Sequence, residues 1–154
     1  MTIYIGIDPG AQGGVARLGN RIEPMAWKMP STEGDICELF DELLAVKLNN
    51  DYEKVVCYIE NVHSMPKQGV VSSFTFGKNY GFLRGVLYSY YIPFEEVTPN
   101  KWQKFLGCQS HGNKNVTKAK AQSLFPTLKI THYIADALLI AEYAKRVHVE
   151  VRRI

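Results

Sequence analysis

Two acidic residues stand where apolar runs of the sequence end. Asp8 closes the alternating segment 2–8, and Glu60 follows the uninterrupted apolar run 55–59. Both runs have the pattern of buried strands. A charge at the end of such a strand is costly unless it is neutralised, paired or bound to a cation. A third acid, Asp136, lies in the first turns of the last predicted helix, and these three residues are the candidates for chemistry.

If the three carboxylates meet, they form a site for divalent cations. Clustered carboxylates repel one another and stay ionised at neutral pH only around such an ion. A ligand set made of oxygen atoms favours Mg²⁺, with Mn²⁺ as a substitute, over zinc. Two such ions activate water and stabilise the leaving oxygen in phosphodiester cleavage. Simpler interpretations stay open: Asp8 can belong to an Asp-Pro-Gly turn with a solvated side chain, and Asp136 can stabilise a helix start.

The acids would be positioned by a mixed sheet that begins with an antiparallel meander. The first two strands are predicted hairpin partners, and proline ends the third. The sequence predicts strands over 2–8, 13–18, 23–30, 54–60 and 92–97. Helices are expected over 31–48, 71–91, 98–107, 115–125 and 132–150. This order predicts an α/β fold with helices on both faces of the sheet, in one domain that spans residues 1–154.

Two helices carry further signals. The first has Ser31 or Thr32 as its N-cap. In the helix over 71–91, three glycines at positions i, i+4 and i+8 form a line (Gly77, Gly81 and Gly85). Glycine costs about 1 kcal/mol relative to alanine in a helix, so this line is expected to admit another backbone. That partner is either a neighbouring helix of the same chain, which we favour slightly, or a second subunit.

Composition and charge exclude some classes of protein and favour one kind of partner. No run approaches the roughly 18 apolar residues of a membrane span, and the N-terminus has no pattern of a signal peptide. The three cysteines match no zinc-binding spacing, which predicts reduced thiols in a cytoplasmic protein, with Cys57 in the core. Six lysines and no acid lie between residues 97 and 135 (Lys101, Lys104, Lys114, Lys118, Lys120 and Lys129). If they share one face, a polyanion such as DNA can bind there; otherwise they form a solvated basic surface.

Four blocks of sequence together resemble one family. They are "IGIDPGAQGGVA", "YIENV", "FTFGKNYGFLRGVL" and "ADALLIAEYA". In this order and at these separations, the chain resembles the RuvC-like Holliday-junction resolvases of the ribonuclease H-like superfamily, especially their shorter phage versions, over nearly its whole length. The resemblance implies a ribonuclease H-like five-stranded fold and a homodimer in the bacterial or phage-infected host cytoplasm. It also implies Mg²⁺-dependent cleavage of Holliday junctions and other branched DNA, with Asp8, Glu60 and Asp136 as metal ligands.

The chain departs from this family at one active-site position. Relatives commonly carry another Asp or a His one helical turn before the last acid. Here Tyr133 lies three residues before Asp136 and His132 lies four before it. His132 is our candidate for the fourth active-site residue, either as a neutral metal ligand or as a base toward the attacking water. The alternative is a surface histidine at a helix cap.

The resemblance also places DNA contacts. The loop after Glu60 would lie near the junction centre, where unstacked bases need an aromatic or planar partner. His63 and Phe74 are the residues that the sequence offers there, and Phe74 is expected to be core instead. Lysines contact phosphates without reading bases, and the candidates are Lys67, Lys114, Lys118 and Lys120.

Two other function classes are compared with the nuclease. Actin-like kinases share the opening strand, acid and glycine-rich turn, but 154 residues leave no room for their second phosphate loop and nucleotide-binding lobe. We therefore expect no organic cofactor. A non-catalytic protein that binds junctions or forks, or a less selective nuclease for branched DNA, would keep the same fold. The intact set of three acids favours catalysis.

Overall fold

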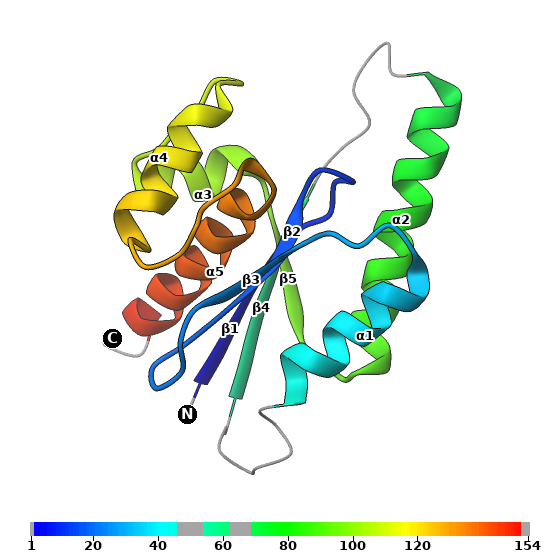
Figure 1. Ribbon diagram of the computed structural model, residues 1–154, viewed down its shortest axis with the longest axis horizontal. Coiled ribbons are helices and arrows are strands. Elements are labelled where there is room, and N and C mark those ends of the chain that lie inside the picture. Colours follow the sequence, from blue (N-terminus) through cyan, green and yellow to red (C-terminus); the bar gives the residue numbers. More distant parts are fainter. Residues whose placement is uncertain (1, 46–53, 62–68, 152–154) are drawn as a thin grey trace.

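The computed structural model describes residues 2–45, 54–61 and 69–151. Its sheet has the strand order β3-β2-β1-β4-β5 (Figure 1). Strands β1, β2 and β3 form the expected antiparallel meander, whereas β4 pairs in parallel with β1 and β5 in parallel with β4. The strands span Thr2–Asp8 (β1), Gly14–Gly19 (β2), Met25–Lys28 (β3), Lys54–Glu60 (β4) and Phe94–Val97 (β5).

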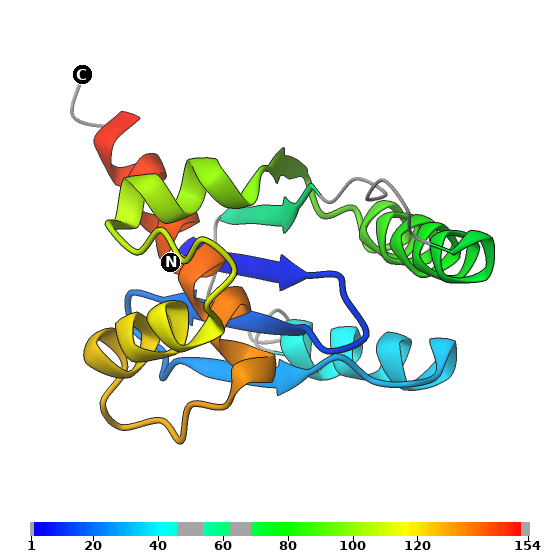
Figure 2. The same ribbon diagram turned by 90° about the horizontal axis from the view of Figure 1, so that it is seen from above.

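Helices cover both faces of this sheet, as predicted (Figures 1 and 2). One face carries α1 (Glu33–Leu44) and α2 (Val70–Ser89), and the other carries α3 (Pro99–Leu106), α4 (Lys114–Leu124) and α5 (His132–Val151). The element order and the mixed five-stranded sheet confirm the predicted fold class.

The central strands are buried on both faces, which explains their apolar composition. In β1, Ile3, Ile5 and Ile7 face the α1–α2 layer, whereas Tyr4 packs in the cluster formed with α5. Cys57 is buried between the sheet and the α1–α2 layer, together with the three isoleucines, as expected. Side chains alternate between faces along a strand, so Asp8 points to the α5 side, like Tyr4.

Helix α5 crosses β1 in direct backbone contact at Gly6. A Cβ atom at this position would overlap the backbone of Ala137 and Ala141. The alternating pattern of β1 therefore has a glycine where α5 approaches. This contact brings the first turns of α5, including Asp136, to the end of β1.

The helix boundaries follow the sequence signals with small differences. Thr32 caps α1 by accepting a hydrogen bond from the Asp35 amide at 3.1 Å. Thr98 occupies the N-cap position of α3, but its side chain makes no capping hydrogen bond. Gly107 ends α3 in the left-handed conformation, with φ 66°. The predicted extension of the first helix beyond residue 45 lies outside the described residues.

Two expectations about α2 are wrong. Phe74 is not a core residue, because 74% of its surface is exposed. Gly77, Gly81 and Gly85 do not admit a neighbouring helix of the same chain, since nothing described lies within 4 Å of a Cβ built on any of them. The buried side of α2 is formed by Leu83, Val86 and Leu87, and the glycines lie on the opposite side. Among the described residues, no helix is long and apolar enough to cross a membrane.

Candidate active site

Asp8 and Glu60 lie side by side at the carboxyl edge of the sheet. Ile7 and Ile59 are partners in the parallel pairing of β1 with β4, so the next residue of each strand is one of the two acids. Neighbouring strands lie about 4.8 Å apart. Both side chains point toward α5, because Tyr58, two residues before Glu60, packs on that face. The strand ends identified from the sequence thus meet in space.

The loop after β1 holds the Asp8 carboxylate in place. The Gly10 amide donates a hydrogen bond to Asp8 Oδ1 at 3.1 Å. Gly13 packs so closely that a Cβ there would overlap the Asp8 carboxyl group. The Asp-Pro-Gly turn is therefore present, but its side chain is half-buried beneath the loop. The alternative of a solvated turn side chain does not describe Asp8.

Glu60 is held by Trp102, a residue that sequence analysis did not single out. The Trp102 indole Nε1 donates a hydrogen bond of 2.7 Å to Glu60 Oε2. Trp102 lies on α3 and is fully buried. A buried tryptophan needs an acceptor for its N–H. This requirement is the only feature of the sequence that could have linked Trp102 to an acid.

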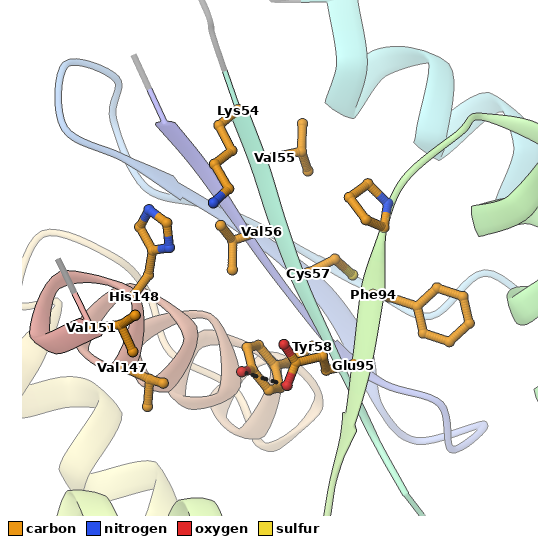
Figure 3. A pocket seen from close by; sticks show the side chains of 11 residues that line it. Lys54, Val55, Val56, Cys57, Tyr58, Phe94, Glu95, Val147, His148 and Val151 are labelled. Carbon is orange, nitrogen blue, oxygen red and sulfur yellow. Dashed lines mark hydrogen bonds between the residues drawn. The ribbon is translucent and has the colours of Figure 1, made fainter.

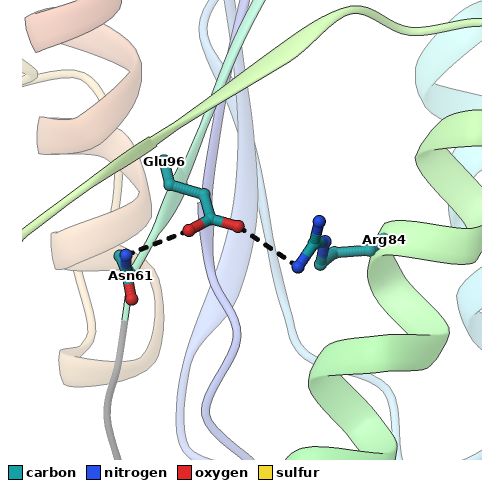
Figure 4. Close-up of polar contacts among 3 residues, drawn as sticks. All are labelled: Asn61, Arg84 and Glu96. Carbon is teal, nitrogen blue, oxygen red and sulfur yellow. Dashed lines mark hydrogen bonds and ion pairs between the residues drawn. The ribbon is translucent and has the colours of Figure 1, made fainter.

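The backbone after Glu60 is also anchored (Figure 4). The Asn61 amide N–H bonds to the Val97 carbonyl at 2.8 Å, and its side chain donates to Glu96 Oε2 at 3.0 Å. Glu96 Oε1 lies 3.4 Å from an Arg84 guanidinium nitrogen on α2. These contacts connect the end of β4 to β5 and α2, so Glu60 has little freedom to move.

Burial raises the pKa of Asp8 and Glu60. The pKa of Asp8 rises to about 6; the Gly10 amide opposes the effect of burial, and the charge of Asp136 adds to it. The pKa of Glu60 rises to about 8, through burial and then through the charge of Asp8, against the hydrogen bond from Trp102. Beyond burial, the charge of Asp136 contributes to the shift of the Asp8 pKa, and the charges of Asp8 and Asp136 contribute to that of Glu60.

Burial also raises the pKa of Asp136, while three polar neighbours oppose that shift. They are the Thr117 hydroxyl, the Lys114 ammonium and His132. Asp136 Oδ1 is buried and has no hydrogen-bond partner among the described residues. A buried, charged oxygen without a partner calls for a cation. The charge of the Lys114 ammonium also opposes the raised pKa of Asp8 and Glu60, so it acts on all three acids.

The chemistry of this donor set suits a divalent cation. Three mutually repelling carboxylates, one of them with an unpartnered buried oxygen, supply the oxygen ligands that Mg²⁺ and Mn²⁺ prefer. Within the described residues, no three acidic, histidine or cysteine side chains form a ready-made ligand set. The carboxylates are therefore gathered at one edge without a closed coordination shell.

The structure separates the two candidates for the fourth position. Helix α5 begins at His132, which is exposed and acts electrostatically on Asp136. Tyr133 turns toward β3, where the Lys28 ammonium lies 4.3 Å from the centre of its ring. His132 thus acts on Asp136, whereas the Tyr133 ring contacts Lys28. The role of His132 as the fourth active-site residue stays a prediction.

A basic cavity of about 670 Å³ adjoins this edge. It is lined by three lysines, Lys114, Lys118 and Lys129, and by Gln12, His132 and Tyr133, among others. Lys129 was not among the predicted contacts. Lys120 does not line the cavity and instead acts on Cys108. His63 and Lys67 lie outside the described residues.

A second cavity, of about 270 Å³, lies at the other end of β4 (Figure 3). Its lining is mostly apolar, and its polar groups include a hydrogen bond of 3.0 Å from the Tyr58 hydroxyl to Glu95. Lys54 at its rim and Glu60 are the first and last residues of β4, about 20 Å apart at the usual rise. This cavity has no gathering of carboxylates, and we do not consider it the active site.

Solved structures show which known fold this arrangement belongs to. Protein-family models and curated proteins give no match. The Thermus thermophilus RuvC structure matches with a TM-score of 0.59 at 17% identity, over 95% of this chain and 96% of that one. The chain has the RuvC fold. T. thermophilus RuvC in complex with Holliday junction substrate matches with a TM-score of 0.60 at 14% identity, over 96% of each chain.

The RuvC fold confirms the resemblance seen in the four sequence blocks at the level of architecture. It also confirms the expected ribonuclease H-like sheet. The match covers nearly the whole chain.

The raised pKa values predict how stability depends on pH and cations. Without cations, the native state binds protons more tightly than the unfolded chain at Asp8 and Glu60, so the free energy of unfolding should fall as pH rises from about 4 to about 8. Mg²⁺ binds the ionised form, so it should raise Tm more at pH 8 than at pH 5. Thermal melts with EDTA or Mg²⁺ check this. Equal Mg²⁺ effects at both pH values, or none, would contradict it.

The hydrogen bond from Trp102 predicts a weaker cation site in a conservative variant. Trp102→Phe keeps an aromatic ring but removes the N–H that orients Glu60, and loss of such a partner typically weakens metal binding about tenfold or more. Calorimetric titration with Mn²⁺ measures this. Trp27→Phe, on β3, is the matched control and should bind Mn²⁺ as the wild type does. Equal Mn²⁺ affinity in both variants would show that Trp102 does not contribute to the cation site.

Proposed function

We propose that the protein is a divalent-metal-dependent endonuclease that cleaves Holliday junctions, and other branched DNA, by two-metal phosphodiester hydrolysis. The observation that carries this proposal is the cluster of Asp8, Glu60 and Asp136, gathered from two strands and a helix of a RuvC fold. One of the matched structures is RuvC in complex with Holliday junction substrate. The basic cavity beside the cluster supplies positive charge for a DNA backbone.

Each residue of the site has a distinct part in this proposal. Asp8, Glu60 and Asp136 would hold Mg²⁺ or Mn²⁺, which when bound activates water and stabilises the leaving oxygen. Trp102 orients Glu60 through its N–H. His132 would accept a proton from the attacking water.

Lys114 would act first on the acids and then on the DNA. Its ammonium offsets the negative charge of the cluster in the free protein. When DNA enters, the same ammonium is available to a phosphate beside the scissile bond. A lysine contributes charge there without sequence readout, which suits an enzyme that selects the shape of its substrate.

We further propose that the enzyme is a homodimer joined through the outward side of α2. At 100° per residue, six residues fall on one stripe: Val70, Phe74, Gly77, Gly81, Gly85 and Tyr88. The three large side chains are 86%, 74% and 65% exposed, and the glycines between them face open space. Small residues let helices approach closely, and exposed apolar patches often mark interfaces. A twofold dimer would present two sites to the symmetric strands of a junction.

The glycines of α2 give this interface a specific test. Gly81→Ala should raise the Tm of the monomer, because alanine is favoured by about 1 kcal/mol in a helix and the added methyl group meets open space. In the dimer the same methyl group would separate the helices. Sedimentation equilibrium should therefore show weaker dimers. Gly34→Ala, in α1 and equally open, should stabilise the fold without affecting association. A Gly81→Ala dimer as tight as the wild type would place the interface elsewhere.

The test of the proposed function compares three DNA substrates. The wild-type protein is incubated with a four-way junction, a replication-fork analogue and a linear duplex, in Mg²⁺, Mn²⁺ or EDTA. Symmetric nicks in the junction that require a divalent cation support the proposal. Equal nicking of forks would indicate a broader nuclease for branched DNA, and tight binding without cleavage in either metal would indicate a non-catalytic junction-binding protein.

A further inference from the structure

Lys28 lies in the same row of the sheet as the proposed catalytic acid Asp8. Asp8 pairs with Gly14 across β1 and β2, and Gly14 pairs with Lys28 across β2 and β3. Directly opposed residues of antiparallel strands point to the same face, so Lys28 emerges on the side that carries α5. Two strand spacings separate its Cα from that of Asp8, roughly 10 Å. The row thus carries a cation close to the acids at the same edge.

Tyr133 fixes the position of this cation. The Lys28 ammonium lies 4.3 Å from the centre of the Tyr133 ring, well within the range of a cation–π contact. The Tyr133 backbone packs closely on β2, because its carbonyl oxygen lies 2.8 Å from where a Cβ at Gly14 would be. Among the described residues, no carboxylate lies within 4.0 Å of the ammonium to neutralise it. Lys28 is exposed, and its ammonium, with the Tyr133 ring as its contact, is available to an anion.

The surroundings connect Lys28 to the basic cavity. Tyr133, whose ring contacts Lys28, is also one of the residues that line the cavity with Lys114 and Lys118. Lys28 also borders a more enclosed cavity of about 330 Å³, whose lining combines polar groups such as those of Ser31 and Asn79 with the Glu33 carboxylate and several apolar side chains. Gln12, at the tip of the loop after β1, lines both cavities. The link between Lys28 and the basic cavity is therefore its contact with Tyr133, together with Gln12, which borders both cavities.

We propose that Lys28, held on the Tyr133 ring, contacts a backbone phosphate of the DNA strand that enters the active site, and so extends the DNA-binding surface from the α4–α5 cavity to β3. This inference rests on the proposed nuclease function and assigns a binding role to a residue pair outside the acid cluster. Tyr133 acts here through its ring, as a positioning residue for Lys28, and its hydroxyl takes no part. A cation that is already immobilised loses less conformational entropy when it binds phosphate.

Variants of the two residues separate this role from a structural one. Junction affinity is measured over a range of salt concentrations in an Asp8→Asn background, which prevents cleavage. Lys28→Ala and Lys28→Gln should each weaken binding about tenfold and reduce the slope of log affinity against log salt by about 1. Lys28→Arg should restore both. Lys54→Ala is the matched control and should change neither quantity, because Lys54 begins β4, at the end of the strands opposite the acids.

Substitutions of Tyr133 test the link between the two side chains. Tyr133→Phe keeps the ring and should bind DNA as the parent does, whereas Tyr133→Leu should weaken binding by less than Lys28→Ala. The double variant Tyr133→Leu/Lys28→Ala should bind no more weakly than Lys28→Ala alone, because both changes remove one contact.

Three results would overturn the inference. If the parent binds junctions and Lys28→Ala behaves like Lys54→Ala, the inference fails and the proposed function stands. If Tyr133→Phe weakens binding as strongly as Tyr133→Leu, the hydroxyl rather than the ring is the active group. If the wild-type protein binds no DNA, the proposed function fails and this inference fails with it.

Discussion

Replacing Asp8 with asparagine is expected to abolish cleavage of four-way junctions while junction affinity is preserved or increased. Asparagine keeps the side-chain oxygen that accepts the Gly10 amide bond, so the loop and the fold should persist. The lost negative charge weakens the cation site. It also reduces the Coulombic repulsion between the acid cluster and an incoming phosphate, which is stronger in a partly buried site than in water.

Two measurements check this expectation. Gel-based cleavage assays follow the junction in Mg²⁺ and Mn²⁺, and binding is titrated in parallel. Asp35→Asn, an exposed acid in the first turn of α1, is the matched control and should cleave normally. If Asp8→Asn loses binding and folding together with cleavage, Asp8 is structural and the assignment of the site is wrong.

Changing Lys114, Lys118 and Lys129 together to alanine is expected to weaken binding to every DNA shape by a similar factor. These residues line the cavity beside the acids, and each would neutralise a phosphate without reading a base. Loss of three phosphate contacts should reduce the salt slope by about 3 and lower affinity roughly a hundredfold at moderate salt.

The matched control for the lysines comes from the same helix. Lys120 lies on α4 but outside the cavity, so Lys120→Ala should cause a much smaller loss. Fluorescence anisotropy with junction, fork and duplex DNA over a range of salt concentrations measures both quantities. An unchanged salt slope in the triple variant would place the cavity away from the DNA.

The positions of the acids could be predicted because they depend on local patterns. An alternating strand and a continuous apolar strand each end at a residue whose type is visible in the sequence, and parallel pairing places Asp8 and Glu60 together. Asp136 follows from helical periodicity, and Gly6 provides the close approach of α5 that delivers it. The antiparallel meander and the helices on both faces were predicted from the same patterns, whereas the full strand order comes from the structure.

Residues that depend on tertiary packing were not predicted. Trp102 reaches Glu60 from α3, 42 residues away along the chain, and no local pattern connects the two. Lys129 and Lys120 are indistinguishable as sequence, and the path of the chain between α4 and α5 decides which one lines the cavity. Phe74 is different, because helical spacing already places it on the side of α2 opposite Leu83 and Leu87.

Cleavage of a supercoiled plasmid that extrudes a cruciform tests the central claim most directly. The base of the cruciform is a four-way junction, and paired cuts there convert the plasmid to linear DNA. We predict that the wild-type protein with Mg²⁺ converts it to linear DNA through two symmetric nicks at the base of the cruciform, and that EDTA or Asp8→Asn leaves it supercoiled. A plasmid that stays supercoiled with bound wild-type protein in both Mg²⁺ and Mn²⁺, or that is nicked equally without a cruciform, would contradict the account.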